Sequence, residues 1–132
     1  SLSMADSHQV THLHYSRSTR RLELTFLDGA DYQLSAEFLR VFSPSAEVRG
    51  HGPGQEVLQT GKSSVAIAGI EPVGHYAAQI TFDDGHDSGL YSWSYLRDLA
   101  ERQDHYWQQY LQQLSAAGKS RDPEVQVIHF DP

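Results

Sequence analysis

Apolar and polar residues alternate along the first third of the chain in the manner of half-buried β-strands. Residues 21–26 place leucine or phenylalanine at every second position, and residues 10–15 alternate more loosely. The Asp28-Gly29 pair predicts a hairpin turn, since glycine tolerates positive φ, and residues 32–34 complete the returning strand. We therefore expect three strands in this part of the chain.

A short helix should follow the hairpin. Ser35 is a favourable N-cap, and the helix is expected to run from Ala36 to Phe42 before Pro44 ends it. Residues 43–62 are rich in glycine and proline, and loops of that length in compact domains are usually functional or disordered. We expect this loop to separate the helix from a second group of strands.

The second group begins with the apolar run 65–70, which predicts a buried strand. In the strand after it, Tyr76, Ala78, Ile80 and Phe82 share one face, because successive side chains of a strand point to opposite sides. A polar segment that contains glycine follows Phe82 before the chain becomes helical.

Two consecutive helices are expected towards the C-terminus. Ser92 or Ser94 caps the first, and where the helical spacing falters Asp104 offers an N-cap for the second, which Gly118 ends. The second helix should pack on the sheet through one apolar stripe. That stripe consists of Tyr106, Trp107, Tyr110, Leu111 and Leu114. Residues 125–130 fit either an edge strand or a mobile terminus.

The order of these elements, strands first and helices later, predicts an α+β fold. We expect a small, mostly antiparallel β-sheet with a short helix after the first hairpin and two consecutive C-terminal helices. The domain should cover residues 10–116. Residues 1–9 are interpreted as a remnant of cloning and a flexible N-terminus, and residues 117–132 as a C-terminal tail.

The composition narrows the classes of function. The net charge of −7 argues against nucleic-acid binding, because phosphate contacts need clustered lysine and arginine. The chain has no cysteine, so thiolate nucleophiles and cysteine ligands for zinc or iron–sulfur clusters are excluded. No apolar run reaches the roughly 18 residues that span a bilayer. We expect a cytoplasmic protein with a protein partner, no cofactor, and no nucleic-acid or membrane partner; its oligomeric state stays open.

Two short motifs resemble catalytic sites but lack their defining spacing. The sequence Gly61-Lys62-Ser63 is similar to the end of a P-loop, yet Glu56 stands where that motif needs glycine. Ser88 and Ser92 also follow His86, but the chain has no Gly-x-Ser-x-Gly elbow. We expect neither nucleotide binding nor nucleophilic catalysis from them.

The segment 82–93 carries the most chemistry, with three carboxylates, a histidine, a tyrosine and a tryptophan between a strand and a helix. We expect Asp83 and Asp84 to cap a tight turn around Gly85, while His86 bonds to a backbone carbonyl. An iron site would need a His-x-Asp/Glu sequence with a later histidine, and the order here is reversed. The turn is therefore our favoured interpretation.

Four ordered segments of the chain resemble the gamma-butyrobetaine hydroxylase-like N-terminal domain family. They are LSAEFLR at 34–40, SPSAEVRGH at 43–51, IEPVGHYA at 70–77 and FDDGHDSGLYSWSYL at 82–96. The resemblance implies a small α+β module that occurs alone in bacteria and fused to other domains elsewhere. In the hydroxylases for gamma-butyrobetaine and trimethyllysine it precedes an oxygenase domain that holds iron and 2-oxoglutarate. We expect this chain to lack that domain and its activity.

The resemblance also implies a structural zinc in those hydroxylases, held by Cys-x-Cys-x-x-Cys and a later histidine. Carried over to this chain, the ligand positions fall on Ser43, Ser45, Val48 and His86. Hydroxyl and aliphatic groups bind zinc poorly. We therefore expect a hydrogen-bonded loop, pinned by Arg49 or His51, in place of the metal.

These observations together predict a non-catalytic accessory or protein-interaction module. By resemblance it is linked to iron–sulfur or oxygenase partner proteins, since some P-loop ATPases with iron–sulfur clusters carry a similar extension. Its binding surface is expected to comprise Arg49, His51, Asp83, Asp84, His86, Tyr91 and Trp93. The alternative is a metal-binding protein or metal-dependent enzyme that uses His51, His75 and His86. A partner surface should expose aromatic side chains, whereas an enzyme should form a concave pocket.

Overall fold

The computed structural model describes residues 9–45, 58–87 and 89–122 and confirms the α+β fold. Its elements are β1 (Val10–Ser16), β2 (Arg21–Phe26), β3 (Asp31–Ser35), α2 (Ala36–Val41), β4 (Ile67–Val73), β5 (Ala77–Phe82), β6 (Gly89–Ser92), α4 (Trp93–Glu101) and α5 (Gln103–Ala117). The short helix after the first hairpin and the two consecutive C-terminal helices are all present.

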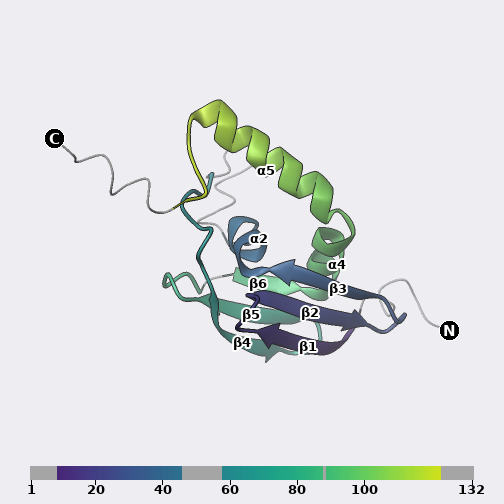
Figure 1. Cartoon of the computed structure of the whole chain (residues 1–132). Helices are drawn as coiled ribbons and strands as arrows, with labels where there is room; N and C mark the ends of the chain where they lie inside the picture. Colours follow the sequence, from purple (N-terminus) through teal and green to yellow (C-terminus); the bar gives the residue numbers. More distant parts are fainter. Residues whose placement is uncertain (1–8, 46–57, 88, 123–132) are drawn as a thin grey trace.

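The strands form two antiparallel three-stranded sheets, β1-β2-β3 and β4-β5-β6. Figure 1 shows β3 passing in front of β6, and the inward side chains of both sheets belong to one buried core. That core includes Leu24, Phe26, Leu34, Ile80, Phe82, Tyr91 and Leu96. The alternation seen in the sequence is confirmed at Leu24 and Phe26 of β2 and at Ile80 and Phe82 of β5, which all point inwards.

The helices form two layers above the sheets (Figure 1). Ser35 caps α2 by accepting a hydrogen bond from the amide of Phe38 at 3.0 Å, as the sequence predicts. Helix α5 lies across the top (Figure 1). The sequence predicts that its stripe packs on the sheet, whereas Trp107 and Tyr110 contact Phe38 and Phe42 at helix α2, with ring centroids 6.3 Å apart in both pairs. Tyr110 and Leu114 of α5 share a buried cluster with Val41.

Three local predictions are corrected by the structure. Tyr76 lies in the β4–β5 turn with 57% of its surface exposed, so it does not belong to the buried face of β5. The apolar run near Ile67 belongs to β4, an outer strand that continues through Pro72, which an edge position tolerates. Asp104 lies in the first turn of α5, whose N-cap is Arg102. Gly118 ends α5 in the left-handed conformation, as expected.

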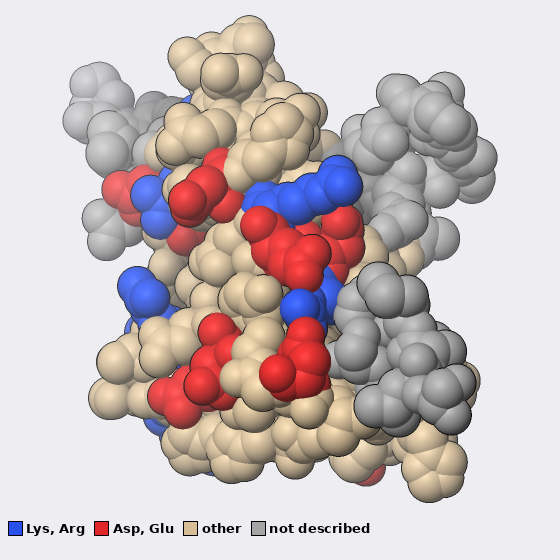
Figure 2. All heavy atoms as spheres, turned by 90° about the vertical axis from the view of Figure 1, so that its right-hand side faces the viewer, with Lys and Arg blue, Asp and Glu red and all other residues tan. Residues whose placement is uncertain are grey.

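The described helices include none that is both long and apolar enough to cross a bilayer. On the face that Figure 2 turns to the viewer, acidic and basic side chains are interspersed, with no large area of one sign. Arg97 illustrates this mixture, because it contacts Asp28 at 3.0 Å and Glu101 at 2.6 Å. The overall negative charge is therefore not gathered into one surface patch on this face.

Candidate functional site

A tight turn connects β5 to β6 and carries the acidic residues of the candidate site. The amide of Gly85 donates to the carbonyl of Phe82 at 3.1 Å, and Gly85 has φ of 91°, where glycine is favoured. Asp84 accepts the amide of His86 through Oδ1 at 3.1 Å, so it caps the turn as expected. Asp83 instead accepts the amide of Ala66 at 3.1 Å and fastens the turn to the start of β4.

His86 is buried beside two serines that follow helix α2. Its Nε2 lies 2.9 Å from Oγ of Ser43 and 3.3 Å from Oγ of Ser45. All three residues are at least 90% buried. The sequence predicts a backbone carbonyl as the partner of this imidazole, whereas the structure places the hydroxyls of another segment against Nε2. His86 therefore joins the β5–β6 turn to the end of α2.

Gly89 makes this close packing possible. A Cβ atom at position 89 would lie 2.6 Å from Oγ of Ser43 and 3.0 Å from the ring of Tyr91. Real Cβ atoms do not approach other atoms that closely, so a larger residue would push Ser43 away from His86. Gly89 is thus required by contact with the residues after α2.

The two aromatic residues of the segment point into the protein. Tyr91 has no exposed surface, its hydroxyl donates to the carbonyl of Leu39, and burial raises its pKa. Trp93 is 8% exposed, and its indole N–H donates to the carbonyl of His75 at 2.8 Å. Neither supplies the solvent-facing contact that the sequence suggests, because both complete the core.

Asp84 is held by two cations from different parts of the chain. Its Oδ2 lies 2.9 Å from Nε of Arg40 on α2 and 2.7 Å from Nζ of Lys62. Arg40 also donates to the side-chain oxygen of Gln59 at 2.9 Å. Partial burial works to raise the pKa of Asp84, but the hydrogen bonds from Lys62, the His86 amide and Arg40 outweigh it and lower the pKa to about 2.

The lysine of the P-loop-like sequence therefore has a structural partner. Lys62 forms an ion pair with the β5–β6 turn, and the amide of Gly61 donates to the carbonyl of Ser120 at 3.0 Å. These bonds attach the segment to its neighbours.

Two of the histidines proposed as metal ligands, His75 and His86, do not come together. His75 precedes β5 and His86 follows it, so a six-residue strand separates them by roughly 20 Å. Within the described ranges, no three histidine or acidic side chains are grouped so that they could hold a metal ion. Arg49 and His51 lie outside the described residues.

Two features of this region were not predicted from the sequence. Leu90 is 42% exposed between the buried residues Gly89 and Tyr91, and the period-two pattern of a strand would have pointed it outwards. Arg40 is buried on α2 and pairs with a turn 44 positions away. No local sequence pattern predicts this ion pair, because Asp84 comes from a distant part of the chain.

Residues 13–97 match the family described as gamma-butyrobetaine hydroxylase-like, N-terminal. The chain belongs to this family. No curated protein matches it.

Solved structures similar to this gamma-butyrobetaine hydroxylase-like domain include two determined by NMR in solution. Both are 50% identical to it, with TM-scores of 0.76 and 0.78. The first match covers 87% of this chain and 90% of the other, and the second covers 93% and 92%. A crystal structure of a protein with unknown function from Acidithiobacillus ferrooxidans, of the DUF971 family, is 35% identical with a TM-score of 0.61. That match covers 72% of this chain and 96% of the other, so the relative consists almost wholly of this module.

The zinc site that the family resemblance implies does not fit the residues of this chain. Ser43, Ser45 and His86 do meet in space, while Val48 lies outside the described residues. However, their donor atoms lie 2.9 and 3.3 Å apart, as direct hydrogen bonds do, and serine hydroxyls are poor zinc ligands. A buried hydrogen-bond cluster occupies the implied metal position.

Proposed function

We propose that this chain is a non-catalytic protein-interaction module. The observation that supports this proposal is that the polar groups of the candidate site bind one another. His86 contacts two serines, and Asp84 contacts Arg40 and Lys62. A catalytic group must instead face a space that substrate can enter. The cluster serves to hold α2 and the β5–β6 turn in fixed positions.

The interaction surface of the proposal joins the loop at 49–51 to the turn that begins at Asp83. The sequence predicts that Tyr91 and Trp93 supply the apolar contact, but both are buried. Leu90 supplies it in this proposal, because it is a large apolar side chain exposed beside the turn. Asp83 and Asp87 are exposed in the turn that precedes Leu90 and would orient a partner. An apolar residue with a charged rim is a common composition for transient protein interfaces.

The family resemblance suggests the partner class. Related modules precede oxygenase domains or extend iron–sulfur ATPases, so we propose that the partner is an oxygenase or an iron–sulfur protein. In this arrangement the module contributes docking, and the partner contributes the chemistry.

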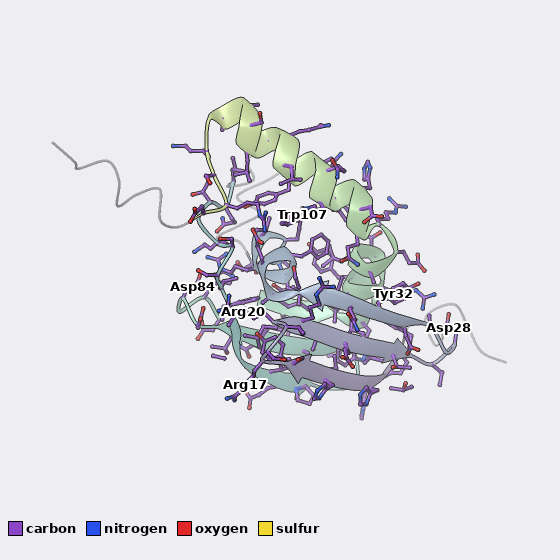
Figure 3. The ribbon with its side chains drawn as sticks, viewed as in Figure 1. Arg17, Arg20, Asp28, Tyr32, Asp84 and Trp107 are labelled. Atoms are coloured by element: carbon purple, nitrogen blue, oxygen red, sulfur yellow. The ribbon has the colours of Figure 1, made fainter. Side chains whose placement is uncertain are left out.

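The proposal is tested by quantitative affinity purification from the source cells at native abundance. The chain is compared with the variants Leu90→Ser and Leu27→Ser. Leu27 is the matched control, because it is 47% exposed but lies in the β2–β3 hairpin next to Asp28. Figure 3 shows Asp28 at the end of the molecule opposite Asp84. We expect one partner to be retained by the wild type and by Leu27→Ser and lost from Leu90→Ser. Equal recovery with both variants would refute the surface.

The class of the partner is tested separately, by measuring its bound iron and its activity with and without the chain. A partner without iron, an iron–sulfur cluster or oxygenase activity would contradict the proposed class of partner. It would not contradict the proposed interaction surface. Turnover of a substrate by the purified chain itself would contradict the non-catalytic assignment.

A further inference from the structure

A pair of histidines on β1 lies outside the region considered so far. His12 and His14 are both exposed, and their ring centroids are 6.5 Å apart with the planes inclined by 22°. Leu13 between them packs against the core. Because alternate residues of a strand stand on the same face, both imidazoles project from the outer face of the β1-β2-β3 sheet.

The strand register brings carboxylates to the same face. His14 pairs directly with Glu23 of β2, and directly opposed residues have Cβ atoms about 4.5–5.5 Å apart. His12 pairs with Thr25, whose hydroxyl donates to Asp31 of β3 at 2.8 Å. Glu23 therefore lies beside His14, and Asp31 lies in the row of His12 one strand further, beyond Thr25.

This combination of groups suits a metal cation. Imidazole nitrogen and carboxylate oxygen are the usual ligands of zinc, nickel and copper in proteins. The nearest basic residue on this face of β2, Arg21, lies one row beyond Glu23, opposite Ser16. In the part of the chain that the structure describes, three such ligands do not yet converge. Binding therefore requires rotation of the two exposed histidine side chains towards Glu23, which is half-buried.

We propose that His12 and His14 form a surface site for a late first-row divalent metal ion, with Glu23 as a third ligand and water in the remaining positions. The site is independent of the proposed interaction surface and does not rest on it. Copper(II) should bind more tightly than nickel(II) or zinc(II), following the general order of stability for such ligands. The ligand set differs from the family's implied zinc site in both position and chemistry.

The test uses the chain without an affinity tag, stripped with chelator and titrated with zinc(II). Binding is followed by calorimetry and by the imidazole signals in NMR spectra. We expect the His12 and His14 signals to shift together with one dissociation constant. His12→Gln and His14→Gln should each weaken binding at least tenfold, and Glu23→Gln several-fold.

The controls are His75→Gln and His105→Gln, which alter other exposed histidines and should leave the affinity unchanged. Melting temperatures of all variants verify that the sheet is intact. Two results would overturn the proposal. One is unchanged affinity in the double variant of His12 and His14, and the other is separate saturation of the two signals, which would indicate two independent single-histidine contacts.

Discussion

Glu37 and Arg121 form an ion pair with two hydrogen bonds, although 84 positions separate them in the sequence. Nε and Nη2 of the guanidinium each lie 2.7 Å from one carboxylate oxygen, and the guanidinium carbon lies 5.0 Å from the Trp107 ring centroid. The side chain of Glu37 on α2 is only 8% exposed, whereas that of Arg121 is 43% exposed. The chain after α5 is therefore fastened to both α2 and α5.

Removing Arg121 should leave a buried carboxylate without its partner. We expect Arg121→Ala to lower the free energy of unfolding by about 1–3 kcal/mol, less than for a fully buried pair because the arginine is partly exposed. Urea denaturation measures the change, and Arg17→Ala at an exposed position is the control, expected within about 0.5 kcal/mol of wild type. Adding Glu37→Gln to Arg121→Ala should recover part of the loss; no recovery would argue against the pair.

The His86 cluster should be structural. His86→Ala leaves the hydroxyls of Ser43 and Ser45 without their imidazole partner, so we expect a loss of about 1–3 kcal/mol of stability. Ser43→Ala, which removes one of these hydroxyls, should cost less than the histidine change. If His86→Ala were as stable as the wild type yet lost the partner described above, the histidine would instead be part of the binding surface.

The ion pairs of Asp84 predict a dependence of stability on acid. Because the pKa of Asp84 is lowered to about 2 in the folded chain and is near 3.9 in an unfolded one, its contribution is complete above about pH 4. That contribution should disappear as the pH falls from about 4 towards 2. Asp84→Asn should be less stable at neutral pH and lose less stability over this acid range. Melting curves at several pH values, with Asp87→Asn as the control, measure both effects; parallel curves for wild type and Asp84→Asn would contradict the assignment.

Two leucines of helix α5 can distinguish a role in core packing from a role in association. Leu114 is 4% exposed and shares its cluster with Val41, whereas Leu111 is only partly buried. We expect Leu114→Ala to cost about 2–5 kcal/mol and Leu111→Ala clearly less. Sedimentation over a concentration series accompanies the denaturation curves. A large change in association with Leu111→Ala, at unchanged monomer stability, would make this side of α5 an interface.

The chain should fold without bound zinc at the family's position. Ser43 and Ser45 replace two of the implied cysteines and already bind His86, so no ligand set is left to bind a structural metal. Thermal melts with and without chelator, together with metal analysis of the untagged protein, provide the test. A stoichiometric zinc that resists chelator, or a large drop in melting temperature, would show that the site is retained.

The sequence by itself determined the elements of this protein because each depends on a few neighbouring residues. Period-two alternation defined β2, Ser35 marked the start of α2, and Gly118 marked the end of α5. The start of α4 was narrowed to Ser92 or Ser94, and the structure selects Ser92. Ser92 accepts the amide of Tyr95 at 3.1 Å, as a capping residue should. The family could also be recognised from the sequence, because four short segments resemble it in the same order along the chain.

Only the tertiary structure decided which polar groups meet and which aromatic residues are buried. His86 contacts Ser43 across 43 positions, and Asp84 contacts Arg40 across 44, because two sheets and α2 converge at that end of the molecule. The same packing turned Tyr91 inwards and left Leu90 exposed. Such contacts depend on how elements that are distant in the sequence pack together. The burial of apolar surface over the whole core stabilises that packing, so no local segment determines it.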